Sequence, residues 1–402
     1  MSQAADGPGG SPDAERGEPL EISICPDLDR VPAADWDALT APDDPFTTHA
    51  FLSTLQHSGS VGAEAGWQSA HVLVRWRGAL VAACPAYVKN HSYGEYIFDW
   101  GWARASEQAG LPYYPKLVAA VPFTPAQGRR LLTHPDAGQG ERPTTATLEE
   151  ALWRGLRAVA DATECWSIHV LFCRASEMTH LESLGAIPRL THQFHWENEG
   201  YADFEAWLAR FRSKLRKEAR RERRRPEQLG ATIEVRRGAD LTGEDWSAME
   251  AFYRHTCDRK WGQAYLSPDF FHRAQTALAD LSMGILARVE GRVVASALLF
   301  QRGRHLYGRY WGCEPAFEQL HFELCYHRPI ELCIQEGWTR FEAGAQGTHK
   351  LRRGLMPQAT RSAHWLRHPG LADAVRTALD KEDRMVALEI EKLAEHGPFR
   401  RG

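Results

Sequence analysis

The sequence contains no long hydrophobic run. Its longest apolar stretches, such as Ala79–Val88, are far shorter than the roughly 18–20 residues that a membrane-spanning helix needs. Residues 1–19 are rich in Gly, Pro, Asp and Glu, and they lack the basic and apolar regions of a signal peptide. We therefore expect a disordered leader over 1–19, no membrane span and a cytoplasmic protein.

The sequence also lacks cysteine pairs and metal-ligand clusters. Its eight cysteines form no Cys-x-x-Cys pair, and no Cys/His group has the spacing of a zinc site. This pattern is typical of a protein with reduced thiols in the cytosol, so we expect no metal and no tightly bound cofactor. The oligomeric state stays open.

The composition is that of a soluble globular protein with more than one domain. Hydrophobic residues make up 43% and charged residues 25% of the 402 positions, close to the averages of folded domains. A chain of this length exceeds the usual ~100–200 residues of one domain. We predict two domains, at 20–198 and 199–402.

Two pairs of similar stretches indicate an internal duplication. Gly185–Trp196 matches Gly354–Trp365 without a gap at Gly, Pro, Thr, His and Trp. A β-hairpin with a turn at glycine is expected in each half, at Arg75–Ala82 and Arg288–Ala295, and each is followed by a Tyr-Gly-x-Tyr string on a further strand. The fold class is therefore α/β (α+β), with a mixed, mostly antiparallel sheet flanked by helices in each half.

Two segments depart from the repeat. Residues 102–148 are rich in Pro, Gly and Tyr, so we expect a long loop or lid inserted in the first half. Tyr201–Arg224 has apolar residues at helical spacing and many Arg and Lys, which predicts one amphipathic basic helix that opens the second domain and ends at Pro226.

Several strings resemble the bacterial FemAB-like predicted N-acyltransferases, which are related to the Fem aminoacyl transferases of peptidoglycan synthesis. They are His91–Asp99, Tyr113–Lys116, Val121–Pro125, Tyr307–Gly312 and Gly344–Lys350. The resemblance spans about 46–365 and implies two tandem domains of the GNAT acetyltransferase type. One position departs from the family pattern: Thr348 stands where an acidic residue is expected in Gly-Ala-Gln-Gly-Glu-His-Lys.

The resemblance implies that the strand at Tyr307–Gly312 and the strand before Gly344 line the substrate cleft. The candidate catalytic residues are Lys350, His349 and Glu342. Lys350 resembles the lysine of Fem transferases, where a cation stabilises negative charge near the reacting carbonyl. The alternative is that Lys350, Arg352 and Arg353 form a solvated basic loop. His349 could act as a general base, because imidazole titrates near neutral pH, or only form hydrogen bonds.

Further polar and aromatic side chains are candidates for substrate binding, with loop packing as the alternative. They are Lys89, His91, Tyr93, Glu95, Tyr113, Tyr114, Lys116, Arg309, Tyr310, Trp311 and Gln346. The basic helix has the composition of a surface that contacts nucleic acid or phosphate, although a solvated helix face is an equal alternative. Its candidate residues are Lys214, Arg216, Lys217, Arg220, Arg221 and Arg224.

The sequence after the central strand indicates the class of acyl donor. Acetyl-CoA enzymes of the GNAT type have a glycine-rich loop there that cradles pyrophosphate. After Gly312 this chain continues Cys-Glu-Pro-Ala-Phe-Glu-Gln, which is acidic and has no glycine. We therefore predict an N-acyltransferase that takes an acyl or aminoacyl group from aminoacyl-tRNA to an amine. The alternatives are an acyl-CoA-dependent GNAT enzyme and a non-catalytic binding module.

Overall fold

The structure is a computed structural model that describes residues 19–260, 264–345 and 347–400. The predicted leader lies almost wholly outside these residues. The strands are β1 (Glu21–Cys25), β2 (Gln68–Ser69), β3 (His71–Trp76), β4 (Ala79–Cys84), β5 (Ala86–Lys89), β6 (Lys116–Ala119), β7 (Leu132–Thr133), β8 (Ser167–Cys173), β9 (Ile187–Glu197), β10 (Thr232–Arg237), β11 (Ser282–Val289), β12 (Arg292–Arg302), β13 (His305–Cys313), β14 (Arg340–Glu342) and β15 (Met356–Leu366). The helices are α1 (Ala33–Asp37), α2 (His49–His57), α3 (Trp100–Gln108), α4 (Thr145–Ala162), α5 (Ala175–Ser183), α6 (Phe204–Ala209), α7 (Ser213–Arg223), α8 (Arg225–Gln228), α9 (Gly243–Lys260), α10 (Pro268–Ala277), α11 (Arg328–Gln335) and α12 (Pro369–Glu395).

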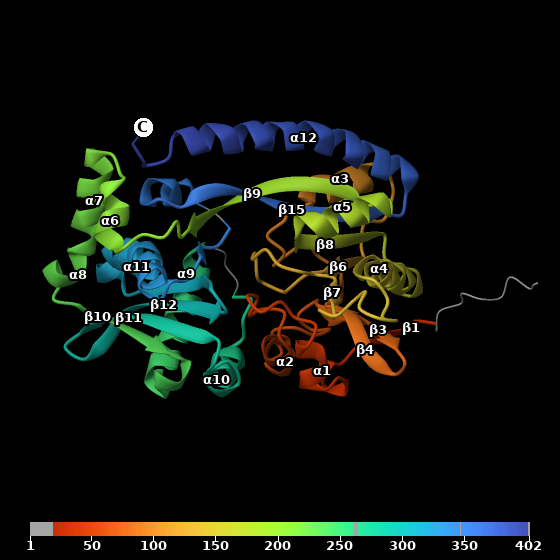
Figure 1. The fold of residues 1–402 in the computed structure, drawn as a ribbon, viewed down its shortest axis with the longest axis horizontal. Helices are drawn as coiled ribbons and strands as arrows, with labels where there is room; N and C mark the ends of the chain where they lie inside the picture. Colours follow the sequence, from red (N-terminus) through yellow and green to blue (C-terminus); the bar gives the residue numbers. More distant parts are fainter. Residues whose placement is uncertain (1–18, 261–263, 346, 401–402) are drawn as a thin grey trace, which may run out of the picture.

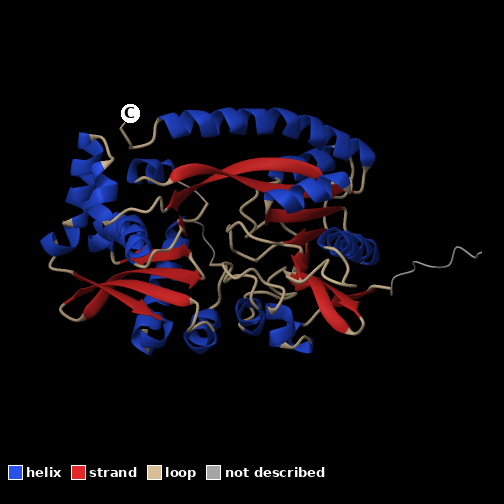
Figure 2. Cartoon of the chain, viewed as in Figure 1, coloured by secondary structure: helices blue, strands red, loops and turns tan. Residues whose placement is uncertain are grey.

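One large sheet runs through both halves of the molecule (Figure 2). Its strand order is β10-β11-β12-β13-β14-β9-β15-β8-β6-β5-β2, and a smaller sheet has the order β1-β3-β4-β7. Most neighbours are antiparallel, while β13 pairs with β14 and β6 pairs with β8 in parallel. The prediction of a mixed, mostly antiparallel sheet flanked by helices is confirmed.

The duplicated motif forms the centre of the large sheet. Its two copies are β9 and β15, which pair antiparallel with Thr191 opposite Thr360, and the two hydroxyl oxygens are 2.7 Å apart. β9 pairs on its other edge with β14 of the second half, and β15 pairs with β8 of the first half. Each half therefore gives its last strand to the other, and the predicted boundary near 198 separates units joined by one continuous sheet.

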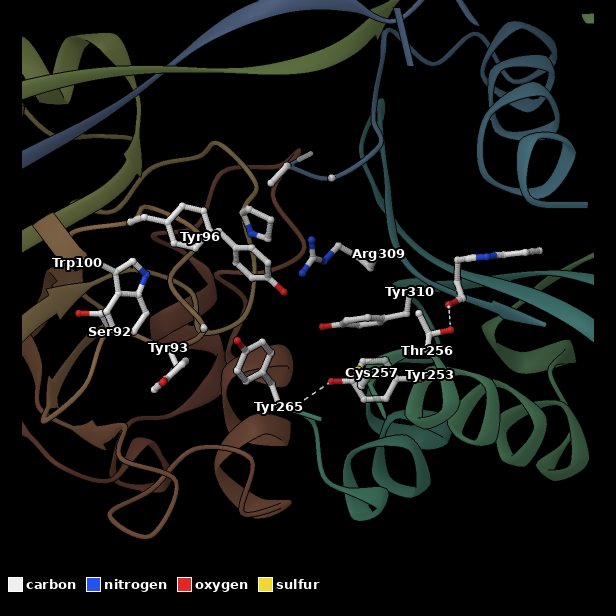
Figure 3. A pocket seen from close by; sticks show the side chains of 16 residues that line it. Ser92, Tyr93, Tyr96, Trp100, Tyr253, Thr256, Cys257, Tyr265, Arg309 and Tyr310 are labelled. Atoms are coloured by element: carbon white, nitrogen blue, oxygen red, sulfur yellow. Dashed lines mark hydrogen bonds between the residues drawn. The ribbon is translucent and has the colours of Figure 1, made fainter. Parts of the chain in front are cut away.

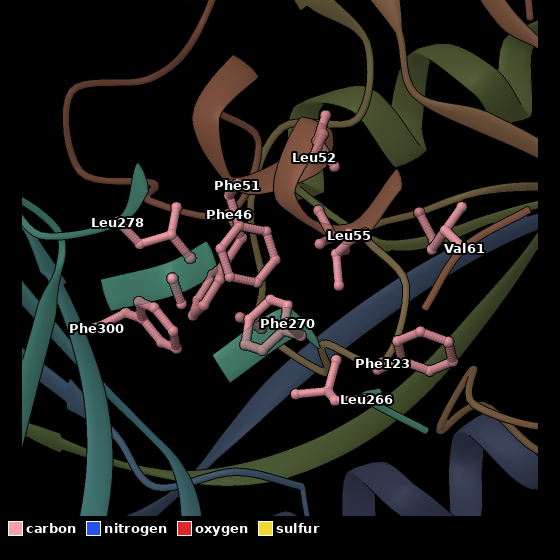
Figure 4. Packing of buried hydrophobic residues seen from close by; sticks show 14 of the residues in the cluster. Phe46, Phe51, Leu52, Leu55, Val61, Phe123, Leu266, Phe270, Leu278 and Phe300 are labelled. Carbon is pink, nitrogen blue, oxygen red and sulfur yellow. The ribbon is translucent and has the colours of Figure 1, made fainter. Parts of the chain in front are cut away.

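The two halves also share a hydrophobic core. Phe46 and Phe51 of the first half contact Phe300 of β12 at ring-centroid distances of 5.6 and 5.4 Å, and Phe270 of α10 lies 6.2 Å from Phe51 (Figure 4). Burying aromatic side chains contributes most of the apolar area of such a core. The exchanged strands and this core fix the position of one half against the other.

The hairpin predictions are confirmed, including their turns. β3 and β4 are joined by Arg77 and Gly78, and β11 and β12 by Glu290 and Gly291; all four residues have positive φ. Such a pair of left-handed residues matches the twist of a tight hairpin, and glycine at the second position avoids steric strain.

Three local predictions are wrong. The segment 102–148 contains most of α3 together with β6 and β7, and β6 is a fully buried strand of the large sheet. Tyr93–Tyr96 lies in a loop, whereas Tyr307–Tyr310 lies on β13. The basic segment is divided into α6, α7 and α8, and Pro226 stands in the first turn of α8, where its missing N–H is tolerated.

Helices cover the sheet on both sides. The long α12 runs along β9 and β15 and spans the top of the view in Figure 1. Its Glu382 pairs with Arg189 at 2.8 Å, and its Asp383 accepts a hydrogen bond from the Leu190 backbone N–H at 2.9 Å. In the described part of the chain, no helix has the length and apolar character needed to cross a membrane.

Candidate active site

The candidate site begins where β13 and β14 separate. The two strands pair in parallel from His305 and Arg340 to Tyr307 and Glu342, where β14 ends while β13 continues to Cys313. A wedge opens between the remainder of β13 and the chain after Glu342. This is the splayed central pair that the family resemblance implies.

A β-bulge aims Arg309 at this wedge. On the β12 side, Leu298 pairs with Tyr310 but Leu299 pairs with Gly308, so Arg309 is the extra residue on β13. Bulges redirect a side chain and are frequent beside active sites. The Arg309 guanidinium donates a hydrogen bond to the carbonyl oxygen of Phe123 in the first half, so it bridges the two halves.

A cavity of about 230 Å³ lies between the loop of the first half and β13 and α9 of the second (Figure 3). Arg309 and Tyr310 extend into it from β13, while Tyr253 and Cys257 line it from α9. Its lining consists of Ser92, Tyr93, Gly94, Tyr96, Phe98, Trp100, Pro125, Tyr253, Thr256, Cys257, Tyr265, Arg309, Tyr310, Trp311, Gly344 and Ala345. The cavity thus occupies the position of the predicted cleft.

Lys350 lies directly behind the wall of this cavity. It belongs to the short 3-10 helix η5 (Thr348–Arg353), and its Nζ donates a hydrogen bond of 2.6 Å to the carbonyl oxygen of Gly344, a lining residue. The side chain is 2% exposed, so it does not belong to a solvated loop. Burial lowers the pKa of Lys350 to about 7, and the positive charge of Arg309 acts in the same direction.

Glu342 lies at the end of β14, opposite His195 of β9. The carboxylate oxygen Oε2 and His195 Nε2 are 3.7 Å apart, and neither carboxyl oxygen has a hydrogen-bond partner among the described residues. Burial raises the pKa of Glu342 to about 8 and lowers the pKa of His195 to about 3. Both groups are therefore neutral at pH 7, and Glu342 does not line the cavity.

We expect Glu342→Gln to retain activity within about tenfold at pH 7, because the amide resembles the protonated carboxyl. The carboxyl favours folding below its unfolded pKa, and this contribution is lost as pH rises through about 8. The melting temperature of Glu342→Gln minus that of wild type should therefore become more positive as the pH is raised from 5 to 9. A fall in kcat of more than about 10²-fold would instead assign Glu342 to proton transfer.

Three predicted substrate-binding residues form a buried ionic network. Lys89 Nζ is 2.7 Å from Glu95 Oε1, and Lys116 Nζ is 2.9 Å from Glu95 Oε2 and 2.5 Å from Asp99 Oδ2. Both lysines are 0% exposed. Burial lowers the pKa of Lys89 to about 8; burial opposes the charge on Lys116 too, but Glu95 and Asp99 raise its pKa above the usual value. These side chains therefore contact one another instead of a substrate.

The network positions the loop that lines the cavity. Lys116 Nζ donates to Ser92 Oγ at 2.7 Å, and Lys89 Nζ donates to the carbonyl oxygen of Tyr93 at 2.7 Å. One side of the cavity is formed by Ser92, Tyr93, Gly94, Tyr96 and Phe98. The prediction that Lys89, Glu95 and Lys116 contact substrate directly is thus replaced by a role in holding this loop.

The other predicted first-half residues surround this loop. Tyr93 is exposed and lines the cavity, while His91 lies in a neighbouring hollow with its Nε2 3.3 Å from the carbonyl oxygen of Ala65. Tyr113 is buried and donates to Asp99 at 2.6 Å. The Tyr114 hydroxyl is 2.8 Å from Ser92 Oγ. Only Tyr93 of these four lines the cavity itself.

In the second half, Arg309, Tyr310 and Trp311, which were predicted to bind substrate, line the cavity. His349 does not line it: its Nε2 is 2.9 Å from the Tyr326 hydroxyl, and its carbonyl oxygen accepts from Arg353. Gln346 lies outside the described residues.

The basic residues form an exposed face on α7. Lys214, Lys217, Arg220, Arg221 and Arg224 surround a shallow hollow there together with Glu218. Arg216 is turned away and donates to the carbonyl oxygen of Ala209 at 3.3 Å. Two acidic residues of the same helix contact η5: Glu218 pairs with Arg352 and Glu222 with Arg353, each at 2.6 Å. The basic face is therefore attached to the segment that carries Lys350.

Sequence reasoning missed the α9 side of the cavity. Tyr253, Thr256 and Cys257 all line it, and Thr256 Oγ1 donates to the carbonyl oxygen of Trp311 at 3.1 Å. No string there resembles a motif. The available signal was their spacing, since residues separated by three and four positions share one face of a helix.

Comparisons with known structures agree with this architecture. FemX aligns over 86% of this chain and 98% of its own, with a TM-score of 0.51 and 11% identity. A conserved protein of unknown function from Bacteroides thetaiotaomicron aligns over 86% and 99%, with a TM-score of 0.51 and 12% identity. A tandem GNAT protein from the clavulanic acid biosynthesis pathway aligns over 87% and 99%, with a TM-score of 0.43 and 12% identity. The likeness to FemX and the Bacteroides protein is one of fold, and it agrees with the predicted architecture of mixed sheets flanked by helices.

The sequence itself matches one family model along nearly its whole length. No curated protein matches it significantly. The family model FemAB-like, described as peptidoglycan biosynthesis/recognition, matches residues 27–401. This protein therefore belongs to the FemAB-like family, and it is a transferase.

Proposed function

We propose that this protein transfers an acyl or aminoacyl group from a donor bound in the cavity to an amine acceptor, and that the donor is an aminoacyl-tRNA. The observation that carries the proposal is Lys350, a buried lysine whose Nζ donates to the carbonyl oxygen of Gly344 at the wedge between β13 and β14. The family description favours an acceptor in peptidoglycan synthesis.

The chemistry needs negative charge to be stabilised. The acceptor nitrogen attacks the carbonyl carbon of the donor ester, so that a C–N bond forms and the carbonyl oxygen becomes an oxyanion. The oxyanion collapses, the C–O bond to the ribose breaks, and the ribose oxygen takes up a proton while the nitrogen loses one. The positive charge of Arg309 at the cavity, and that of protonated Lys350 behind Gly344, favour the oxyanion.

The basic face of α7 supports tRNA as the donor. Its exposed Lys and Arg side chains match a phosphate backbone, whose contacts make binding salt-dependent. The ion pairs Glu218–Arg352 and Glu222–Arg353 join this face to η5. The segment after β13 has no glycine-rich loop for a pyrophosphate; it continues into a short helix with Glu314 and Glu318.

Filter retention of labelled aminoacyl-tRNA, and separately of labelled acyl-CoA, tests the donor. We expect tRNA retention that weakens with salt, and Lys217→Glu/Arg221→Glu should lower the slope of log K against log[salt] by about 2. The control Arg376→Glu/Lys381→Glu makes the same charge change on exposed positions of α12 and should leave the slope unchanged. Retention of acyl-CoA alone would overturn the tRNA donor, and retention of neither would favour a binding module.

A further inference from the structure

The cavity has an aromatic and uncharged lining apart from Arg309. Tyr93, Tyr96, Tyr253, Tyr265 and Tyr310 line it, together with Phe98, Trp100 and Trp311 (Figure 3). Arg309 is the one charged side chain among the lining residues that the structure describes. The cavity therefore offers apolar ring faces to most of a bound group.

The tyrosine rings of the second half are fixed in position. The Tyr253 and Tyr310 rings meet edge to face at 5.0 Å, and Tyr265 stacks on Phe123 at 5.2 Å. The Tyr253 hydroxyl accepts hydrogen bonds from the backbone N–H groups of Tyr265 and Leu266, each at 3.0 Å. Burial raises the pKa of both Tyr253 and Tyr310, so these rings stay neutral. The cavity is built before a ligand enters.

Chemically different groups line the cavity. Arg309 and Gly344 line it beside the wedge, and Lys350 donates to the carbonyl oxygen of Gly344 from behind. Tyr253 and Cys257 line it from α9, and the Tyr253 ring packs edge to face on Tyr310. In the proposed transfer, the reacting carbonyl would lie near Arg309 and the acyl side chain against α9.

The volume admits more than a small side chain. In another protein an apolar cavity of about 150 Å³ binds benzene, and this cavity has about 230 Å³. A glycyl or alanyl group would leave most of that space without contacts. A lysyl side chain would find no carboxylate among the described lining residues and would be repelled by Arg309.

We propose that this cavity selects an uncharged acyl group with an aromatic or bulky aliphatic side chain, and that Tyr253, Tyr265 and Tyr310 determine this specificity. The proposal rests on the proposed function, since it names the group that the transferase moves. It assigns the tyrosines a binding role and no part in proton transfer.

Binding of amino acid methyl esters to the full chain tests the selectivity without a tRNA. We expect the phenylalanine and leucine esters to bind at least about tenfold more tightly than the glycine and alanine esters in calorimetry. The lysine and glutamate esters should bind no better than the alanine ester. Equal or tighter binding of the glycine, alanine, lysine or glutamate ester to the wild-type protein would overturn the proposal.

A variant that fills the cavity gives a second test. Cys257→Phe should weaken binding of the phenylalanine ester at least about tenfold and leave binding of the alanine ester unchanged. The control His255→Phe adds the same side chain at an exposed position of α9 and should preserve the wild-type ranking. If Cys257→Phe does not fold, the wild-type ranking still decides the question.

Transfer assays separate the two proposals. Efficient transfer of glycyl or alanyl groups by the wild type, equal to that of phenylalanyl groups, would contradict the selectivity and leave the transferase function intact. Selective ester binding with no transfer from any aminoacyl-tRNA or acyl-CoA would contradict the proposed function and leave the selectivity standing.

Discussion

Lys350→Met is expected to lower kcat by about 10²-fold with little change in donor binding. Removal of one preorganised group that stabilises an oxyanion has an effect of about 10²–10³-fold in other enzymes. Here Lys350 acts from behind Gly344, so the lower end of that range applies. Single-turnover kinetics with saturating acceptor, together with filter retention of the donor, measure both quantities.

The pH dependence of the rate shows whether the protonated or the neutral form of Lys350 is active. Because its pKa is about 7, the cation is lost as pH rises above 7. Titration of the acceptor amine affects the wild type and Lys350→Arg equally, so it cancels in the ratio of their rates. The ratio then reports the titration of Lys350, because arginine stays protonated. We expect this ratio to fall above pH 7. A ratio that rises through pH 7 would show that neutral Lys350 acts as a base.

Stability distinguishes a functional Lys350 from a structural one. A buried lysine with a lowered pKa opposes folding below its unfolded pKa, and the penalty is complete below about pH 7. Lys350→Met should therefore raise the melting temperature at pH 7 while it removes activity. Loss of both activity and stability would indicate that the Gly344 hydrogen bond holds the fold.

The sequence allowed the repeat to be found but not the exchange of strands. Gly185–Trp196 and Gly354–Trp365 match residue by residue, so two equivalent strands could be predicted. A repeated pattern contains no information about which half each copy pairs with. That outcome depends on tertiary packing, in which Thr191 meets Thr360 and each His-Trp pair crosses to the opposite half.

Two similar strings adopt different secondary structures. Tyr93–Tyr96 and Tyr307–Tyr310 share their tyrosines and glycine, yet one is a loop and the other a strand. In the first half Pro85 interrupts the long strand, because it has no N–H for the ladder, and β4 and β5 enter different sheets. The strand that corresponds to β13 is β6, which begins at Lys116 inside the segment expected to be a loop.

The candidate site was predicted best where residues are adjacent in sequence. Arg309, Tyr310 and Trp311 belong to one resembling string and all line the cavity. Lys350, a candidate from another such string, lies behind the lining residue Gly344. Tyr253, Cys257 and Tyr265 come to the cavity only through the packing of α9 against β13, which no local pattern specifies.

The duplicated strands face different partners in the two halves. At the exchanged strands His195 faces Glu342 of β14, whereas His364 faces His169 of β8, and the two imidazole Nδ1 atoms are 2.8 Å apart. The first half has a buried histidine pair where the second has a carboxyl. Its loop, which the ionic network holds, instead forms one wall of the cavity between the two halves.

Lys116→Met is expected to destabilise the protein by about 3–5 kcal/mol, because it removes one partner from a buried charge network. Lys89 and Lys116 balance Glu95 and Asp99, and all four are buried. Although burial by itself raises the pKa of Asp99, Lys116 lowers it to about 2. The stabilising contribution of Asp99 is therefore present above about pH 4 and lost as pH falls towards 2. Urea denaturation at pH 7 measures the change.

A second substitution tests whether charge balance is the cause. Lys116→Met/Asp99→Asn restores neutrality, so it should lose less stability than Lys116→Met alone, with a coupling of about 1–3 kcal/mol in a double-mutant cycle. The exposed control Lys381→Met should change stability by less than about 0.5 kcal/mol. Because Lys116 also holds Ser92, whose loop lines the cavity, the folded double variant should raise KM more than it lowers kcat. A Lys116→Met protein as stable as wild type, with unchanged KM, would show that the network neither holds this loop nor shapes the cavity.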